Sequence, residues 1–264
     1  MPMVKAGTQL IFYAHVPKCG GSSVSKYLSD RFGPVAFNDK RHLRYDPQSQ
    51  WTRSSPQHLD AKNLARLFPP GFLDAVFTIV RHPVGRLISA YHFQLEYEGR
   101  IPSQGGFSDW LAELPGRLAE DPFIYDNHFR PMSDFVPKGA KVFHLEHGLD
   151  ALVPWFDEMT GTQAPPRAIP VTNKRGRSIG RRAPPLVTPT DREVEQIIKL
   201  YAEDFRRFGY EADSRMPLAP PPVLSAELVS QRDAERAERA RRSRRSVRRM
   251  VRKIGLHRPA WLRR

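Results

Sequence analysis

Short apolar runs alternate with longer mixed segments through the first 210 residues. The apolar runs are rich in β-branched and aromatic residues and predict strands at residues 9–16, 75–80 and 140–145. The longer segments predict helices at residues 21–32, 83–97, 107–119, 148–160 and 191–208. Because strands that alternate with helices are typical of an α/β fold, we expect a single three-layer domain with a central parallel sheet. Residues 33–56 are polar with little periodicity, which predicts a loop or lid.

The turn after the first predicted strand has the composition of an anion-binding loop. It reads Pro17-Lys18-Cys19-Gly20-Gly21-Ser22-Ser23 and leads into a predicted helix. The glycines let the backbone pass close to an anion, and the N–H groups of residues 20–23 would point at it. The lysine and the serines add a charge and hydroxyl donors. Since the lysine precedes the glycines, this is neither a Walker A loop nor a G-x-G-x-x-G turn. A glycine-rich turn with a solvated lysine would have the same composition.

A second strand-to-helix junction places Arg81 at the carboxyl end of its strand, the edge from which α/β sheets bind ligands. Pro83 suits the start of the following helix, because its missing N–H would have no helical partner there. Ser89 lies two helical turns further on. The sequence leaves three roles open for Arg86: an ion pair with an acid, exposure to solvent, or contact with a ligand. Two anion sites on one sheet indicate a ligand with two separate phosphate-like groups.

Together, the two junctions resemble those of sulfotransferases that use 3'-phosphoadenosine 5'-phosphosulfate (PAPS). Residues 17–23 resemble the P-loop-like 5'-phosphosulfate loop of that family, and Arg81 with Ser89 resembles its 3'-phosphate motif. The chain is most similar to the carbohydrate branch, which includes heparan 2-O- and chondroitin 4-O-sulfotransferases and their bacterial relatives. The likeness extends from about Gln9 to Tyr210. It includes the segments at residues 128–132, 143–146 and 201–205.

The resemblance implies transfer of a sulfuryl group from PAPS, without a metal, to a hydroxyl of a carbohydrate or glycolipid by in-line displacement. Lys18 would stabilise the charge that grows on the leaving phosphate, and Arg81 with Ser89 would hold the 3'-phosphate. The residues that the resemblance assigns to PAPS binding are Lys18, Cys19, Gly20, Gly21, Ser22, Ser23, Arg81 and Ser89.

An acceptor hydroxyl needs a base, and histidine has the best-matched pKa. His58 lies between the two phosphate motifs, in the interval where the carbohydrate branch carries its proposed catalytic histidine. We therefore expect His58 to be the base, with His42 and His128 as alternatives. The heparan branch has two histidines in the corresponding tripeptide, whereas this chain has only His58 there. His15 and His82 are expected to have structural roles.

Cys19 is the only cysteine, which excludes an intrachain disulfide and a cysteine-based zinc site. Its place beside Lys18 at a helix start would allow a lowered thiol pKa, but we interpret Cys19 as a spacer in the loop. No pair of His or Glu residues has convincing metal-ligand spacing. A nucleotide-dependent phosphotransferase is the alternative enzyme, but it would need a Mg²⁺-binding hydroxyl and an acid in Walker spacing, which the sequence lacks.

Charge is distributed unevenly along the 264 residues. Residues 225–264 carry 14 Lys or Arg and 4 Asp or Glu, so that +10 of the net charge of +14 lies in this segment. The proline-rich residues 216–224 would separate this basic, helical or disordered tail from a sulfotransferase domain at residues 1–215. Such a tail would suit an anionic membrane, a nucleic acid or an acidic polysaccharide, and the terminal Trp261-Leu262 favours the membrane.

No apolar run approaches the roughly 20 residues needed to span a bilayer, and residues 1–7 lack the apolar core of a signal peptide. We therefore expect a cytoplasmic enzyme with peripheral contact at the inner membrane face. A nucleic-acid-binding protein would explain the tail but neither Lys18 nor Arg81. The sequence indicates neither the acceptor nor the oligomeric state.

Overall fold

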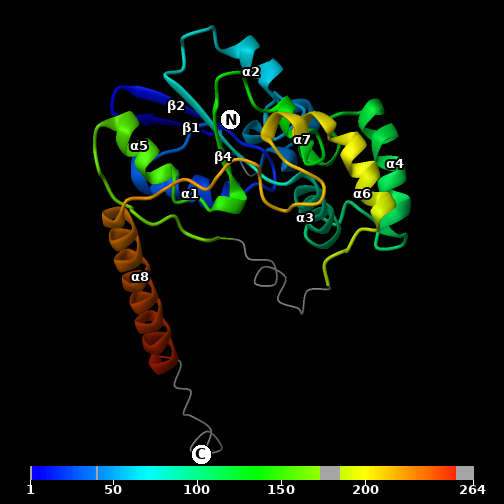
Figure 1. The fold of residues 1–264 in the computed structure, drawn as a ribbon. Helices are drawn as coiled ribbons and strands as arrows, with labels where there is room; N and C mark the ends of the chain where they lie inside the picture. Colours follow the sequence, from blue (N-terminus) through cyan, green and yellow to red (C-terminus); the bar gives the residue numbers. More distant parts are fainter. Residues whose placement is uncertain (1, 40, 173–184, 254–264) are drawn as a thin grey trace, which may run out of the picture.

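A four-stranded sheet with strand order β1-β2-β3-β4 forms the centre of the computed structural model, which describes residues 2–39, 41–172 and 185–253 (Figure 1). The strands are β1 (Met3–Ala6), β2 (Gln9–Ala14), β3 (Ala75–Val80) and β4 (Lys141–His144). β2, β3 and β4 are parallel neighbours, so the predicted strands and the α/β class are confirmed.

β1 is a strand that the hydrophobic pattern did not predict. It pairs antiparallel with β2, from Met3 opposite Phe12 to Ala6 opposite Gln9, and the two strands are joined by a tight turn at Gly7 (φ 63°). The sheet is therefore mixed rather than fully parallel. Four residues are too few to show the alternation by which a strand is recognised in a sequence.

Eight α-helices surround the sheet in the part of the chain that the structure describes. They are α1 (Gly21–Phe32), α2 (Ala61–Leu67), α3 (Pro83–Glu96), α4 (Phe107–Glu120), α5 (Leu152–Thr160), α6 (Asp191–Leu200), α7 (Ala202–Phe208) and α8 (Ala226–Lys253). The helix expected at residues 191–208 is divided at Tyr201, where φ and ψ are −115° and 27°. The Tyr201 hydroxyl donates a hydrogen bond to the Phe129 carbonyl (2.7 Å), which holds the ring in the core at the break.

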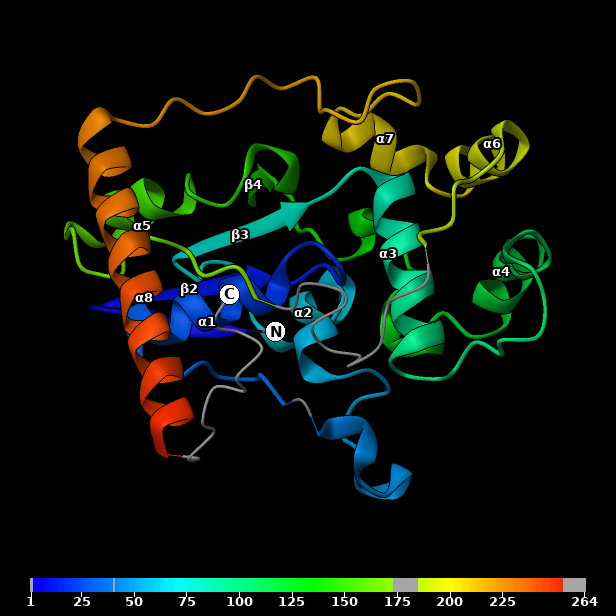
Figure 2. The same ribbon diagram turned by 90° about the horizontal axis from the view of Figure 1, so that it is seen from below.

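Helices cover both faces of the sheet, because successive strand side chains point to opposite faces. Tyr13 and Phe77 face the larger core, which includes residues of α1 and α5. Phe12 faces a smaller core together with Leu64 of α2. Helices α3, α4, α6 and α7 gather beyond the carboxyl ends of β2 and β3 (Figure 2). This arrangement encloses the strand-to-helix junctions at that edge.

The first half of α8 packs against the domain beside α5 (Figures 1 and 2). Leu228 is buried in the main core, and Arg232 and Arg236 both form ion pairs with Asp150 (3.0 Å each). Glu235 accepts hydrogen bonds from the backbone of residues 167 and 168. The segment before α8, at residues 216–224, contains no helix or strand. None of the described helices is long and apolar enough to cross a membrane.

Candidate active site

The two strand-to-helix junctions meet at one edge of the sheet. β2 and β3 are adjacent and parallel, with Ala14 opposite Thr78, and the Thr78 hydroxyl donates to the Ala14 carbonyl (2.8 Å). The chain then leaves both strands in the same direction, toward α1 and α3. Arg81 Nη1 donates a hydrogen bond to the Lys18 carbonyl oxygen (3.4 Å). The two cations that the sequence placed in separate motifs therefore belong to one site.

The loop after β2 has an unusual backbone. Lys18 (φ 66°) and Gly20 (φ 84°) are both left-handed, and the lysine adopts this conformation at a cost of about 1 kcal/mol. Gly21 has a different requirement, because a Cβ there would lie 1.7 Å from His15 Nε2. The second glycine is thus needed to accommodate the His15 imidazole. The sequence had explained it only by the close approach of an anion.

The first N–H groups of α1 point into this loop, since an α-helix leaves them without helical partners. Gly20 is the residue before the helix, and its carbonyl accepts hydrogen bonds from Ser23 N–H (3.0 Å) and Val24 N–H (3.2 Å). The N–H of residue 23, which the sequence analysis directed at an anion, is thus bonded within the first turn of α1. Binding of an anion by the rest of the loop stays a prediction.

Two side chains that the sequence assigned to the ligand point elsewhere. Cys19 is buried in the main core with its thiol toward the Pro17 carbonyl (3.7 Å). Burial raises the pKa of the Cys19 thiol to about 12, against the lowered pKa that the sequence allowed. The Ser23 hydroxyl forms two hydrogen bonds with Thr172. It lies 3.2 Å from the Thr172 hydroxyl, and it accepts a hydrogen bond from the Thr172 N–H (3.1 Å). Cys19 can thus offer a ligand only its backbone, whereas Ser22 is exposed.

Lys18 and Arg81 form a positively charged pair. No carboxylate lies within ion-pair distance of either residue among the described residues. The Lys18 ammonium lies 3.8 Å from the centre of the Phe93 ring, and burial, followed by the charge of Arg81, lowers the pKa of Lys18 to about 8. Ser89 lies on α3 and is partly buried. Two neighbouring cations at two helix N-termini create a site for an anion.

The buried Arg86 side chain connects the backbone segments that form this site. It is completely buried, its Nε donates to the Pro17 carbonyl (3.3 Å), and its Nη2 donates to the carbonyls of His128 (3.1 Å) and Arg130 (2.5 Å). The sequence left three roles open for Arg86. The structure shows a fourth, in which one guanidinium joins α3 to the loop after β2 and to residues 128–130.

Three histidines gather beside the charged pair. The ring centres of His15 and His58 are 5.1 Å apart, as are those of His58 and His128. His128 also packs on Phe93, the ring that Lys18 covers. The histidine expected to be the base therefore lies in the same cluster as the phosphate loop.

His58 is hydrogen-bonded to an acid that the sequence analysis did not single out. Its Nδ1 lies 2.8 Å from Asp126 Oδ2 and 3.1 Å from the Asp126 carbonyl oxygen. Burial alone would raise the pKa of the Asp126 carboxyl, but His58 and two further neighbours, His128 and Ser55 N–H, hold that pKa well below its usual range. Asp126 is therefore ionised at neutral pH.

The other histidines have different surroundings. Burial, and then the charge of His58, lowers the pKa of both His15 and His128 well below the usual value, so both are neutral. His128 Nδ1 is bonded to Gln94 Nε2. His42 bonds the Thr52 carbonyl (2.8 Å) and packs against two aromatic rings outside the cluster. The two alternatives to His58 are thus engaged in packing contacts.

His58, Asp126 and His128 have donor atoms within 4.8 Å of one another, a spacing that a metal site would also show. However, both carboxylate oxygens of Asp126 already accept hydrogen bonds, one of them from His58. The charges of Lys18 and Arg86 lower the pKa of His128, so they would also oppose a cation. These contacts fit a hydrogen-bonded histidine–aspartate pair better than a divalent ion.

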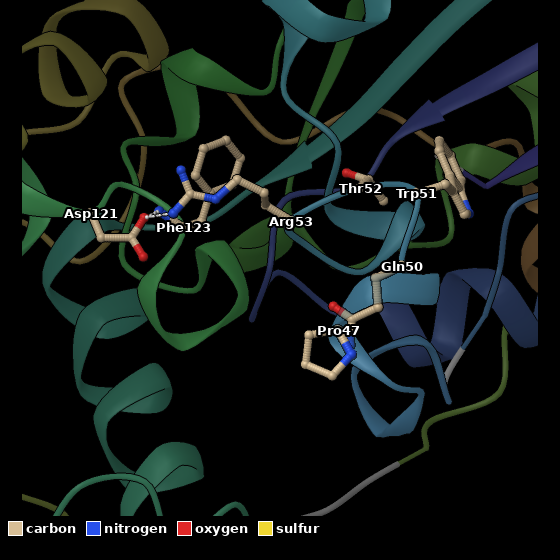
Figure 3. Close-up of a pocket in the computed structure, with 7 residues that line it drawn as sticks. All are labelled: Pro47, Gln50, Trp51, Thr52, Arg53, Asp121 and Phe123. Atoms are coloured by element: carbon tan, nitrogen blue, oxygen red, sulfur yellow. Dashed lines mark hydrogen bonds and ion pairs between the residues drawn. The ribbon is translucent and has the colours of Figure 1, made fainter.

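An open hollow of about 350 Å³ lies between residues 47–53 and residues 121–123 (Figure 3). Arg53 crosses it, pairs with Asp121 (2.9 Å) and covers the Phe123 ring at 4.5 Å. The remaining lining residues are Pro47, Gln50, Trp51 and Thr52. Its two walls continue along the chain into His58 and Asp126. The segment that the sequence predicted to be a loop or lid thus forms one wall of a surface hollow.

Comparisons with known proteins agree with this geometry. The model of the Sulfotransferase family matches residues 2–211, and the chain belongs to that family. A protein-tyrosine sulfotransferase from Arabidopsis thaliana is 32% identical over 98 residues, which are 35% of this chain and 19% of that relative. No solved structure matches significantly. Membership of the Sulfotransferase family disfavours both the phosphotransferase and the nucleic-acid-binding interpretations.

Proposed function

We propose that this enzyme uses PAPS as donor and sulfates a hydroxyl group. The observation that carries the proposal is the adjacency of Lys18 and Arg81, two cations on neighbouring loops with no carboxylate partner among the described residues. A nucleotide with anionic groups at its 5' and 3' positions suits such a pair. Lys18 and the start of α1 would hold the 5' group, and Arg81 with Ser89 would hold the 3'-phosphate.

The same residues account for the transfer. The acceptor oxygen forms a bond to sulfur while the bond from sulfur to the phosphate oxygen breaks, and its electron pair stays on that oxygen. Lys18 would neutralise this growing charge, which is the main contribution a preorganised site makes. His58 takes the proton of the acceptor hydroxyl. Ser22, exposed at the second position of α1, would add a hydroxyl donor to the leaving phosphate.

For the acceptor we propose a carbohydrate or a glycolipid. The hollow between residues 47–53 and 121–123 is open, and it offers the exposed Trp51 ring and the Arg53–Asp121 pair to a polar ring. Aromatic faces with a few polar groups suit sugars. A tyrosine hydroxyl is the second candidate, because the Arabidopsis relative is a protein-tyrosine sulfotransferase.

The test is an acceptor screen with the purified full chain and sulfur-labelled PAPS. The panel contains capsular polysaccharides, glycolipids, small glycosides and tyrosine peptides. Lys18→Ala should lower transfer about 100-fold or more, the scale of losing one preorganised donor. Lys26→Ala is the matched control, since this lysine lies on the outer side of α1, paired with Asp30. No transfer to any acceptor, together with no binding of adenosine 3',5'-bisphosphate, would overturn the proposal.

We also propose that the enzyme is cytoplasmic and that α8 brings it to the inner membrane face. The first half of α8 is fixed to the domain through Leu228 and the Asp150 ion pairs. Beyond residue 240 the helix carries arginines at 241, 242, 244, 245, 248, 249 and 252 with a lysine at 253. A rigidly mounted basic helix suits an anionic surface that carries a lipid-linked acceptor.

A further inference from the structure

Three consecutive residues beside His58 have a backbone conformation that is rare outside glycine. Tyr125 (φ 54°), Asp126 (φ 57°) and Asn127 (φ 63°) are all left-handed. Each such residue costs roughly 1–2 kcal/mol, so the surrounding structure must compensate for the run. Strain of this kind gathers where a side chain has to be aimed.

The run aims two side chains at the short 3-10 helix Pro56–His58. Asp126 Oδ2 accepts from His58 Nδ1 at 2.8 Å, and its Oδ1 accepts from Ser55 N–H at 2.6 Å. Asn127 Nδ2 donates to the His58 carbonyl at 2.9 Å. The ring and the backbone of His58 are thus held by adjacent residues of one turn.

The proton on the His58 ring has only one favourable place. Nδ1 faces two acceptors, the Asp126 carboxylate (2.8 Å) and the Asp126 carbonyl (3.1 Å), and neither can donate a hydrogen bond. Nδ1 must therefore carry hydrogen, which leaves the lone pair on Nε2. The other titratable rings packed against His58 are His15 and His128, and both are neutral.

We propose that Asp126 is a positioning residue for the reaction, which fixes the Nδ1–H tautomer of His58 and stabilises the imidazolium that forms during sulfuryl transfer. This inference rests on the proposed function, with His58 as base. Nε2 receives the proton of the acceptor hydroxyl as the new oxygen–sulfur bond forms. Asp126 itself gains no proton, because its carboxylate remains ionised beside the charged ring.

The first measurement is the tautomer of His58 in the unaltered full chain, from nitrogen NMR of the imidazole. We expect the Nδ1–H form; an Nε2–H form would overturn the inference. This readout needs neither turnover nor an identified acceptor. It therefore still decides the inference if the variant below does not fold, and it separates failure of the inference from failure of the proposed function.

The second measurement is kinetic, with whichever acceptor the screen yields. Asp126→Asn should lower kcat about 100-fold or more and leave the KM for PAPS nearly unchanged. The acidic limb of the profile of kcat/KM against pH should move to lower pH, because loss of the carboxylate disfavours the imidazolium. A purely structural role would leave that limb in place. Asp126→Glu, which keeps the charge, should restore part of the rate and the limb.

Asp109→Asn, an identical change at an exposed position on α4, is the matched control and should leave all these quantities unchanged. An active wild-type enzyme with an Asp126→Asn variant of equal kcat and an unmoved acidic limb would overturn the inference while leaving the proposed function intact.

Discussion

Arg86 Nε donates a hydrogen bond to the Pro17 carbonyl (3.3 Å), although the two residues belong to different strand-to-helix junctions. The same guanidinium bonds two further carbonyls, so one buried side chain joins three segments of the site. Near it, Asp204 accepts hydrogen bonds from the backbone N–H groups of Met132 (2.7 Å) and Ser133 (2.8 Å). Burial raises the pKa of Asp204, and the charge of Arg86 opposes that rise.

Arg86→Met should therefore lower the free energy of unfolding by at least about 3 kcal/mol, because it leaves several buried carbonyls without donors. Urea unfolding monitored by circular dichroism measures the loss. Arg66→Met, an exposed arginine on α2, should change stability by about 0.5 kcal/mol or less. Equal stability of the two variants would contradict the role given to Arg86.

Lys18 predicts a pH dependence of nucleotide binding. Its pKa is about 8 in the free protein because of burial and Arg81, and a bound anion would raise that pKa. Affinity for adenosine 3',5'-bisphosphate should be nearly constant between about pH 7 and 8, where the phosphates of the ligand are fully ionised, and fall above pH 8 by up to about tenfold per pH unit, as binding takes up a proton. Calorimetry in buffers of different ionisation enthalpy measures both effects. In Lys18→Arg, which stays charged, the decline should vanish; a decline of the same size would assign it to another group.

Arg81 predicts selectivity for the 3'-phosphate. The protein should bind adenosine 3',5'-bisphosphate far better than adenosine 5'-monophosphate. Arg81→Ala should weaken the bisphosphate about 10- to 100-fold, the range of a charge-assisted hydrogen bond, and leave the monophosphate little changed. Ser89→Ala should have a smaller effect in the same direction. Arg100→Ala, an exposed arginine after α3, is the control. Equal affinities of the wild type for both nucleotides would remove the support for a 3'-phosphate site.

The basic half of α8 predicts membrane adsorption. Each basic residue near an anionic surface contributes about 1 kcal/mol at low salt. The full chain should sediment with vesicles that contain phosphatidylserine, but not with neutral phosphatidylcholine vesicles. A chain that ends at Ala240 should stay in solution with its nucleotide binding unchanged. It keeps Leu228 and the Asp150 ion pairs, which a chain ending near Pro222 would lose. Equal partitioning of the full and shortened chains would mean that α8 does not bind lipid.

The predicted strands at residues 75–80 and 140–145 appear in the structure as β3 and β4. β3 lies inside the sheet and is a nearly continuous apolar run, as is typical of a buried parallel strand. The same pattern missed β1, which is stabilised by pairing with β2. It also joined α6 and α7, since the amphipathic pattern continues across Tyr201. Long-range contacts of the Tyr201 ring, which a local pattern does not contain, place the break.

The residues of the candidate site also fall into those that the sequence could bring together and those that it could not. Lys18 and Arg81 could be placed together in advance, because the carboxyl ends of adjacent parallel strands lie at one edge. Asp126 could not, since no glycine marks its left-handed turn and 68 residues separate it from His58. Its side chain meets Ser55 and His58 only through contacts between segments far apart in the sequence.

The order of residues along the chain was enough to define the α/β class and both strand-to-helix junctions, because these depend on local periodicity and on the rule that strands end at a common edge. The choice of His58 as base came from the resemblance to carbohydrate sulfotransferases and stays a prediction. Tertiary packing alone decided which side chains of the loop after β2 stay accessible, because it buries Cys19 in the core and bonds Ser23 to Thr172. It also decided the protonation of the cluster. Burial and neighbouring charge set the pKa values of Lys18 and Asp126. These two causes exist only in the folded protein, where segments far apart in the sequence pack against each other and exclude water.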